Sequence, residues 1–170
     1  MSSPVHFFTP TADTALDLRR AFGRYGTGVT VVTAHGEDGP VGMTANSFAS
    51  ISLDPPLVMW SPAISSRRHD AFVQARSFCI HVLGMDQMRM AAHFAKRGHG
   101  FDAFEWENGP GKAPALAGCV AVFHCDTHAV HPAGDHSLIL GRVRHVALSR
   151  DDRPGLLFDQ GRYGQFVESD

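Results

Sequence analysis

Apolar residues occur in short runs along most of the chain, and several of these runs alternate with polar residues. Alternation with a period of two, with β-branched residues set between Gly, Pro and Asp, predicts β-strands. Six or seven short strands are expected, at residues 29–34, 41–45 continuing into 48–53, 57–60, 77–83, 119–127, 137–149 and 156–158. Most connections are as short as hairpins, which favours an antiparallel sheet closed into a barrel.

Three segments follow a helical pattern instead. Residues 11–24 predict a helix, because Ala15, Leu18 and Phe22 are spaced to form one apolar stripe. A short helix is expected within 66–75, and a longer one at 85–96 with Met88, Ala91, Ala92 and Ala95 on one face. Residues 97–114 show no period and predict a long loop. The expected fold class is therefore mainly β with peripheral helices.

Length and composition indicate one domain. The chain has 170 residues, of which 44% are hydrophobic and 19% are charged, enough to bury a core. We expect a single domain over residues 1–170, with residues 1–12 as a flexible N-terminal arm. The net charge of −2 argues against a nucleic-acid partner. No run approaches the ~18 apolar residues of a membrane span.

The cysteines and the N-terminal residues give two indications of the cellular compartment. The three cysteines are odd in number and show no CxxC spacing, so a disulfide framework is not expected. The first ten residues lack the charged and apolar regions of a secretory signal. We therefore expect a cytoplasmic protein.

Motifs that identify common nucleotide-binding and hydrolytic sites do not occur. The glycines at 23, 26 and 28 have the reverse of the dinucleotide-binding spacing and follow a helix, and Gly111-Lys112 continues with Ala113 rather than Ser or Thr. HExxH and GxSxG are absent. The sequence therefore predicts neither a Rossmann unit nor a P-loop.

The densest polar signal is the segment 42–50. Thr44, Asn46, Ser47 and Ser50 place hydroxyl and amide groups in a stretch otherwise built for a core. Such groups can bind a phosphate or the polar edge of a heterocycle. The alternative is a strand whose polar side chains satisfy one another. A second cluster, residues 61–68, offers either an anion site at a helix N-terminus or an ordinary capped helix.

Histidines suggest two further possibilities. His136 follows Asp135 at the start of a strand, where it could act as a general acid or orient a ligand, or could simply be exposed beside a turn. His124, Asp126 and His128 alternate on one strand. An exposed polar strand face is favoured there over a zinc site, because zinc sites cluster their ligands more tightly. No metal ligand is assigned.

The order of the motifs resembles the short-chain flavin reductase family, the reductase components of two-component monooxygenases that serve hydroxyphenylacetate, phenol and styrene hydroxylases. The resemblance covers residues 16–164 and is carried by residues 22–33, 42–48, 52–58, 78–83, 93–95 and 134–136. It implies a split β-barrel that binds FMN or FAD, usually as a homodimer with flavin near the subunit interface.

The same resemblance implies the site residues. Contact with the flavin would come from Thr27, Gly28, Val29, Thr44, Ala45, Asn46, Ser47, Ser50, Ser61, Ser65, Val82, His93, Phe94, Arg97 and Tyr163. His136 would be the catalytic position that places the nicotinamide. His81 stands where many relatives carry Asn, so the contact there is left open.

The implied activity is reduction of FMN or FAD by hydride transfer from NADH or NADPH. Free reduced flavin would then diffuse to a separate monooxygenase. Two alternatives are kept: an electron carrier with tightly bound flavin, and a non-enzymatic histidine-rich metal-binding domain.

Overall fold

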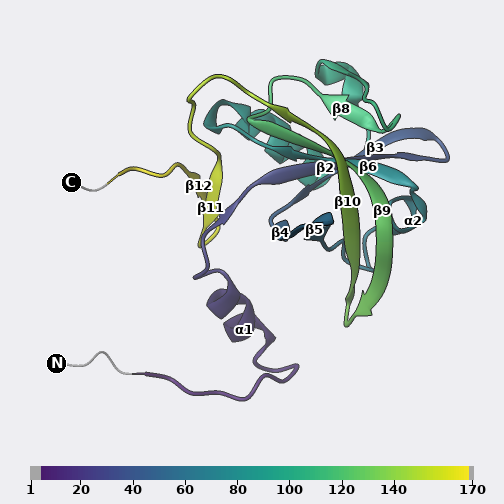
Figure 1. Cartoon of the computed structure of the whole chain (residues 1–170). Coiled ribbons are helices and arrows are strands. Elements are labelled where there is room, and N and C mark those ends of the chain that lie inside the picture. The colour runs from purple at the N-terminus through teal and green to yellow at the C-terminus, as the bar shows by residue number, and fades with distance from the viewer. Residues whose placement is uncertain (1–4, 169–170) are drawn as a thin grey trace.

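The computed structural model of the chain describes residues 5–168 (Figure 1). Its helices are α1 (Ala15–Phe22), α2 (His69–Gln74) and α3 (Met88–Lys96), with the 3-10 turns η1 (Met85–Gln87) and η2 (Phe101–Ala103). The strands are β1 (Thr27–Gly28), β2 (Thr30–Gly36), β3 (Gly39–Ala45), β4 (Ala49–Leu53), β5 (Pro56–Trp60), β6 (Ser77–Val82), β7 (Trp106–Asn108), β8 (Pro114–Leu116), β9 (Ala121–Ala133), β10 (His136–Leu148), β11 (Leu157–Asp159) and β12 (Arg162–Gly164).

Seven strands form one antiparallel sheet in the order β3-β2-β6-β9-β10-β5-β4. The mainly β class with peripheral helices is confirmed, but the expectation of a closed barrel is wrong. The two edge strands, β3 and β4, follow one another in the chain and do not pair. The intervening segment 46–48 carries the chain away from β3, and β4 then pairs with β5 alone.

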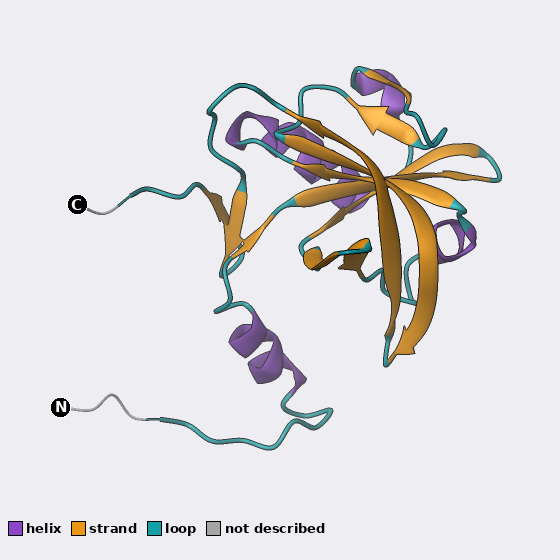
Figure 2. Cartoon of the chain, in the orientation of Figure 1, coloured by secondary structure: helices purple, strands orange, loops and turns teal. Residues whose placement is uncertain are grey.

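The strand count of six or seven is also wrong for the described residues. The segment 97–114, predicted as a loop, contains η2 and β7 and reaches the start of β8. A second small sheet has the order β1-β11-β12. These strands are two or three residues long, too short to show a period of two. Figure 2 shows them as separate strands beside the large sheet.

Two parts of the molecule extend from the body (Figure 1). Strands β9 and β10 form a long twisted ribbon of two 13-residue strands. Helix α1 confirms the helix predicted within 11–24, but none of its residues is buried, and Phe22 on its apolar stripe is 70% exposed. The part of the predicted arm at residues 5–12 has no helix or strand, and residues 1–4 lie outside the described part of the chain.

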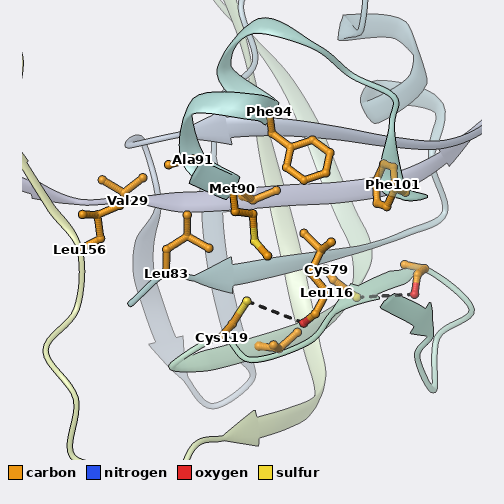
Figure 3. Close-up of a cluster of buried hydrophobic side chains, with 13 residues drawn as sticks. Val29, Cys79, Leu83, Met90, Ala91, Phe94, Phe101, Leu116, Cys119 and Leu156 are labelled. Atoms are coloured by element: carbon orange, nitrogen blue, oxygen red, sulfur yellow. Dashed lines mark hydrogen bonds between the residues drawn. The ribbon is translucent and has the colours of Figure 1, made fainter. Parts of the chain in front are cut away.

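The core forms two clusters of buried apolar side chains. One lies beneath α3, where Met90, Ala91 and Phe94 face Val29 and Leu83 (Figure 3). The other packs α2 against the sheet through aromatic contacts among Trp60, Phe72 and Phe78. Helix α3 therefore covers β3, and helix α2 covers β2.

The cysteines are buried and unpaired. Burial raises the pKa of Cys79 and Cys125 to about 12 and that of Cys119 to about 11. The thiol of Cys79 lies 3.2 Å from Nδ1 of His124. No helix among residues 5–168 is long and apolar enough to cross a membrane.

Candidate functional site

Strand pairing brings three strand ends together. Thr30, the first residue of β2, pairs with Ala45 at the end of β3 on one side and with Val82 at the end of β6 on the other. The Thr30 hydroxyl donates to the Ala45 carbonyl oxygen at 2.8 Å. Residues 27–29 lead directly into this position. Predicted site residues that are far apart in the chain therefore meet where β2 begins and β3 and β6 end.

The segment after β3 is joined to the loop after β5 through two serines. The Ser61 amide donates to Oγ of Ser47 at 2.9 Å, and the Ser47 hydroxyl lies 3.3 Å from the Ser61 carbonyl oxygen. Both residues are half-buried, whereas Asn46 and Ser65 are exposed. The two polar clusters of the sequence are thus one structural unit.

The loop after β5 continues to the start of β10. Ala63 forms a bridge with His136, and the Ile64 amide donates to the Asp135 carbonyl oxygen at 2.9 Å. The contiguous set of side chains and backbone formed by Thr44, Ala45, Asn46, Ser47, Ser61, Ser65 and His136 is called the polar rim below.

His136 is held by its neighbour in the chain. Nδ1 of His136 lies 2.7 Å from the Asp135 carboxylate, and the side chain of His136 is 40% exposed. The hydrogen bond from His136 is the main cause that lowers the pKa of Asp135, followed by the charge of the imidazole. An ionised Asp135 accepts from Nδ1–H, so Nε2 is the ring nitrogen left to face a ligand.

Helix α3 offers fewer side chains to a ligand than the sequence predicts. The Thr44 hydroxyl donates to the Ala91 carbonyl oxygen at 2.7 Å, which fixes the helix against β3. His93 places Nε2 2.7 Å from the His99 carbonyl oxygen. Phe94 is fully buried, so its side chain has no surface to offer a ligand. Arg97 is exposed one residue past the helix.

The second polar cluster does not place Ser61 at a helix N-terminus, and α2 has no side-chain cap. Helix α2 begins at His69, well after Ser61, and its N-cap, Arg68, makes no side-chain cap bond. The Arg68 guanidinium instead donates to the carbonyl oxygens of Gly42 at 3.0 Å, Phe94 at 2.7 Å and Ala95 at 3.4 Å. Burial lowers its pKa. Arg68 therefore joins α3 to β3, and only the neighbouring Arg67 is exposed.

Residues 27–29 differ in how far they are accessible to a ligand. Val29 is 2% exposed, its amide donates to the Leu156 carbonyl oxygen, and its own carbonyl accepts from Leu83, so it has no group left for a ligand. Gly28 is exposed. Oγ1 of Thr27 is buried and has no hydrogen-bond partner among the described residues.

Two further predicted residues, Tyr163 and Ser50, also lie outside the polar rim. Tyr163 belongs to β12 and its ring packs against that of Phe158 in β11. On its other side, Phe158 pairs with Thr27 of β1. With its strand neighbours, Tyr163 lines a hollow of about 530 Å³. Ser50 is exposed on β4, opposite Val58. Neither makes a hydrogen bond to the rim.

His81 is a core residue. Nδ1–H donates to the Val31 carbonyl oxygen at 2.9 Å, and Nε2 accepts from the Leu116 amide at 2.9 Å. The ring is fully buried, and this burial is the main cause that lowers its pKa to about 4. Both nitrogens are used within the fold, which answers the question left open at this position: the side chain does not reach a ligand.

Among the polar residues that alternate on β9, His124 and Asp126 make contacts within the fold, whereas His128 is exposed. Asp126 accepts from Nε of Arg144 at 2.6 Å, and His124 is buried against Cys79. Among residues 5–168, no group of three or more His, Cys, Asp or Glu side chains is placed to hold a metal ion.

Sequence reasoning did not single out three residues near the rim, namely Thr30, His69 and Ser137. Thr30 bonds to Ala45, and His69 lies 2.9 Å from Ser137, next to His136. Each makes a contact with a residue distant in the chain. No local pattern marks such a contact; the only signal is a polar residue in an otherwise apolar strand, at Thr30.

The chain is thus a mainly β protein with an open antiparallel sheet and a polar rim where several of its strands begin or end. Residues 22–166 match the family model described as a flavin reductase like domain. The chain belongs to this family.

Individual proteins similar to this chain are also flavin reductases. The chain is 49% identical over 161 residues to an FMN reductase (NADH) of Agrobacterium fabrum, covering 95% of this chain and 91% of the relative. It is 38% identical over 153 residues to the reductase subunit of a flavin-dependent monooxygenase of Rhodococcus jostii, covering 88% and 78%. An NADH:FAD oxidoreductase of Streptomyces globisporus, solved in complex with NAD and FAD fragments, superposes with a TM-score of 0.85 at 38% identity, covering 95% and 98%.

The residues present fit a flavin. FMN and FAD offer phosphate, hydroxyl and heterocycle edges, and the rim supplies hydroxyl and amide groups that can pair with them. The buried hydroxyl of Thr27 needs a partner, since an unpaired buried polar atom is costly. The neighbouring Gly28 is exposed and a Cβ there would meet nothing within 4 Å, so the backbone next to Thr27 is open to a ligand.

Proposed function

We propose that this chain binds FMN or FAD, reduces it with NADH or NADPH, and releases the reduced flavin to a separate monooxygenase. The observation that carries the proposal is the continuity of the polar rim from Ser47 through Ser61 to His136. It gives one surface on which a flavin and a nicotinamide can lie against each other. The named activities of the relatives support this direction.

A bound flavin supplies the redox chemistry by accepting a hydride from the nicotinamide. The protein's part is to bind and orient, because hydride transfer needs the two reacting atoms in close, aligned contact. Ser47, Ser61 and Ser65 would hold the polar chain of the flavin, with Asn46 and the Thr27 hydroxyl at its other edges. Thr44 contributes by fixing α3 to β3.

His136 would contact the nicotinamide. Its Nδ1–H is occupied by Asp135, so Nε2 can accept a hydrogen bond, for example from the carboxamide of the nicotinamide. This assigns orientation to His136 rather than proton transfer. The exposed Tyr163 and Arg162 lie on the C-terminal hairpin, which could cover the bound nicotinamide.

We also propose that the chain acts as one domain and as a homodimer. Helix α1 buries nothing within its own chain, and Phe22, Tyr25, Leu148 and Phe166 are all at least 70% exposed. Apolar area of this kind is normally covered by a partner. Sedimentation of the purified chain would test this, and a monomer at micromolar concentration would contradict it. A cytoplasmic location is in keeping with three free thiols.

The activity is tested by oxidation of NADH and of NADPH, each with free FMN and with free FAD. Multiple turnovers with at least one pair are expected. If flavin instead copurifies and stays bound, and free flavin is not turned over, the chain is an electron carrier. Adding a flavin-dependent monooxygenase across a dialysis membrane would separate diffusion of flavin from transfer by contact.

A further inference from the structure

Three side chains form a hydrogen-bonded array next to His136. Nε2 of His69 lies 2.9 Å from Oγ of Ser137, and Nδ1 of His69 lies 2.8 Å from the Asp70 carboxylate. His69 and Asp70 are the first residues of α2, and Ser137 is the second residue of β10. The array therefore joins α2 to the strand that begins with His136.

Asp70 determines which nitrogen of His69 faces Ser137 as an acceptor. A carboxylate only accepts, so Nδ1 carries the proton and Nε2 is left with a lone pair. The Ser137 hydroxyl donates to that lone pair. The His69 side chain is 12% exposed and Ser137 is 8% exposed, so little water competes for this bond.

Serine, histidine and aspartate are linked in the same order as in a hydrolase triad, but their surroundings do not suit hydrolysis. A nucleophilic serine must be open to its substrate and close to donors for an oxyanion. Ser137 is buried, and its amide donates to the Pro62 carbonyl oxygen at 3.1 Å. The array is placed to hold the backbone of β10 rather than to attack a substrate.

The end of the β9–β10 ribbon has few other attachments. Residues 131–135 are all exposed. Apart from pairing within the ribbon, this end is held by two backbone hydrogen bonds to the loop after β5, from Ile64 to Asp135 and from Ser137 to Pro62. The His69–Ser137 bond is the side-chain contact that joins it to α2. Because neighbouring strand residues point to opposite faces, fixing Ser137 inward fixes the direction of His136 outward.

We propose that His69 is a positioning residue for nicotinamide binding: held by Asp70, it fixes Ser137 and thereby the orientation of the His136 imidazole. This rests on the role proposed above for His136. A misdirected imidazole weakens its contact with the nicotinamide and leaves the flavin-binding part of the rim, at Ser47 and Ser61, unchanged.

The test is steady-state kinetics of Ser137→Ala and His69→Ala with NADH and free flavin. Each variant should raise KM for NADH about fivefold, the effect of one lost hydrogen bond, with KM for flavin and kcat within about twofold of the parent. His69→Gln should restore most of the affinity, because its amide oxygen can accept from Ser137. Thr127→Val is the matched control. The Thr127 hydroxyl donates to the Ala75 carbonyl oxygen at 2.7 Å, at the far end of α2, so this variant should leave KM for NADH unchanged.

A double-mutant comparison separates positioning from general loosening. Adding Ser137→Ala to His136→Ala should raise KM for NADH no further. A further increase there, an equal rise in KM for flavin, or no effect of Ser137→Ala would overturn the inference while leaving the reductase activity in place. Absence of NADH oxidation by the parent with either flavin would instead overturn the proposed function.

Discussion

The guanidinium of Arg68 lies 2.7 Å from the carbonyl oxygen of Phe94, the residue that anchors α3 in the core. The same guanidinium also bonds to Gly42 of β3. One half-buried cation thus satisfies backbone carbonyls at the end of a helix and on the adjacent strand. Charged donors suit such positions, because the carbonyls at a helix C-terminus have no partner within the helix.

Replacing Arg68 with Ala should therefore lower stability and flavin affinity together. Unpaired buried carbonyls cost ~1–3 kcal/mol of unfolding free energy, and a loosened α3 moves away from Thr44. Denaturant unfolding and KM for flavin measure the two effects. Arg67→Ala is the control, because Arg67 is the exposed neighbour and should leave stability unchanged. Equal stability of the two variants would contradict the role assigned to Arg68.

Gly42 is expected to tolerate no side chain. A Cβ there would lie 2.4 Å from Cδ1 of Phe94, and Phe94 is fully buried and cannot move aside freely. Overpacking of this kind costs ~1–3 kcal/mol, so Gly42→Ala should lower the midpoint of thermal unfolding. Gly164→Ala serves for comparison, because a Cβ at Gly164 meets nothing within 4 Å. A stability of Gly42→Ala equal to the parent would show that the ring has room to shift.

His81 should make the fold sensitive to acid. Its pKa is lowered from 6.5 to about 4 in the folded protein, so the unfolded chain binds the proton more readily. Stability is therefore fully present above pH 6.5 and is lost as pH falls from 6.5 to about 4. The loss is ~3 kcal/mol by the usual conversion.

The measurement for His81 is urea unfolding at a series of pH values, for the parent and for His81→Asn. The amide of Asn does not titrate, so the variant should be less stable at neutral pH but should lose less stability between pH 6.5 and 4. Parallel curves for the two proteins would show that other groups cause the acid sensitivity.

His136→Ala should raise KM for the nicotinamide more than KM for the flavin. Nε2 of His136 is the group assigned to the nicotinamide, whereas the flavin contacts lie at Ser47 and Ser61. KM for NADH should rise about tenfold, because the variant loses one hydrogen bond to the nicotinamide and leaves the nicotinamide group unpaired. Equal effects on both substrates would refute the assignment.

Local pattern predicted most helices and strands, because burial on one side leaves a period in the sequence. The prediction that the sheet closes into a barrel was wrong, because a strand's pattern shows which face is buried and not whether its edge pairs with another strand. The stripe of α1 illustrates a related limit. Leu18 and Phe22 predict a helix with one apolar face, but they cannot say whether that face packs on its own chain.

The site was predictable where polar residues interrupt an apolar segment, as at Thr44 and Ser47. The approach of Ser47 to Ser61 and of His69 to Ser137 depends on how the sheet folds. Phe94 and Val29 show a different limit. Both lie in segments that carry the resemblance, but their side chains are in the core. A motif marks which segment approaches the cofactor, and burial then decides which atoms can touch it.

The buried cysteines have a consequence for an enzyme that releases reduced flavin. Free reduced flavin reacts with oxygen and generates hydrogen peroxide, which oxidises thiolates far faster than thiols. Cys79, Cys119 and Cys125 are all shielded from solvent and remain protonated at neutral pH, because burial raises the pKa of each. Burial therefore keeps these three thiols in the form that peroxide oxidises slowly.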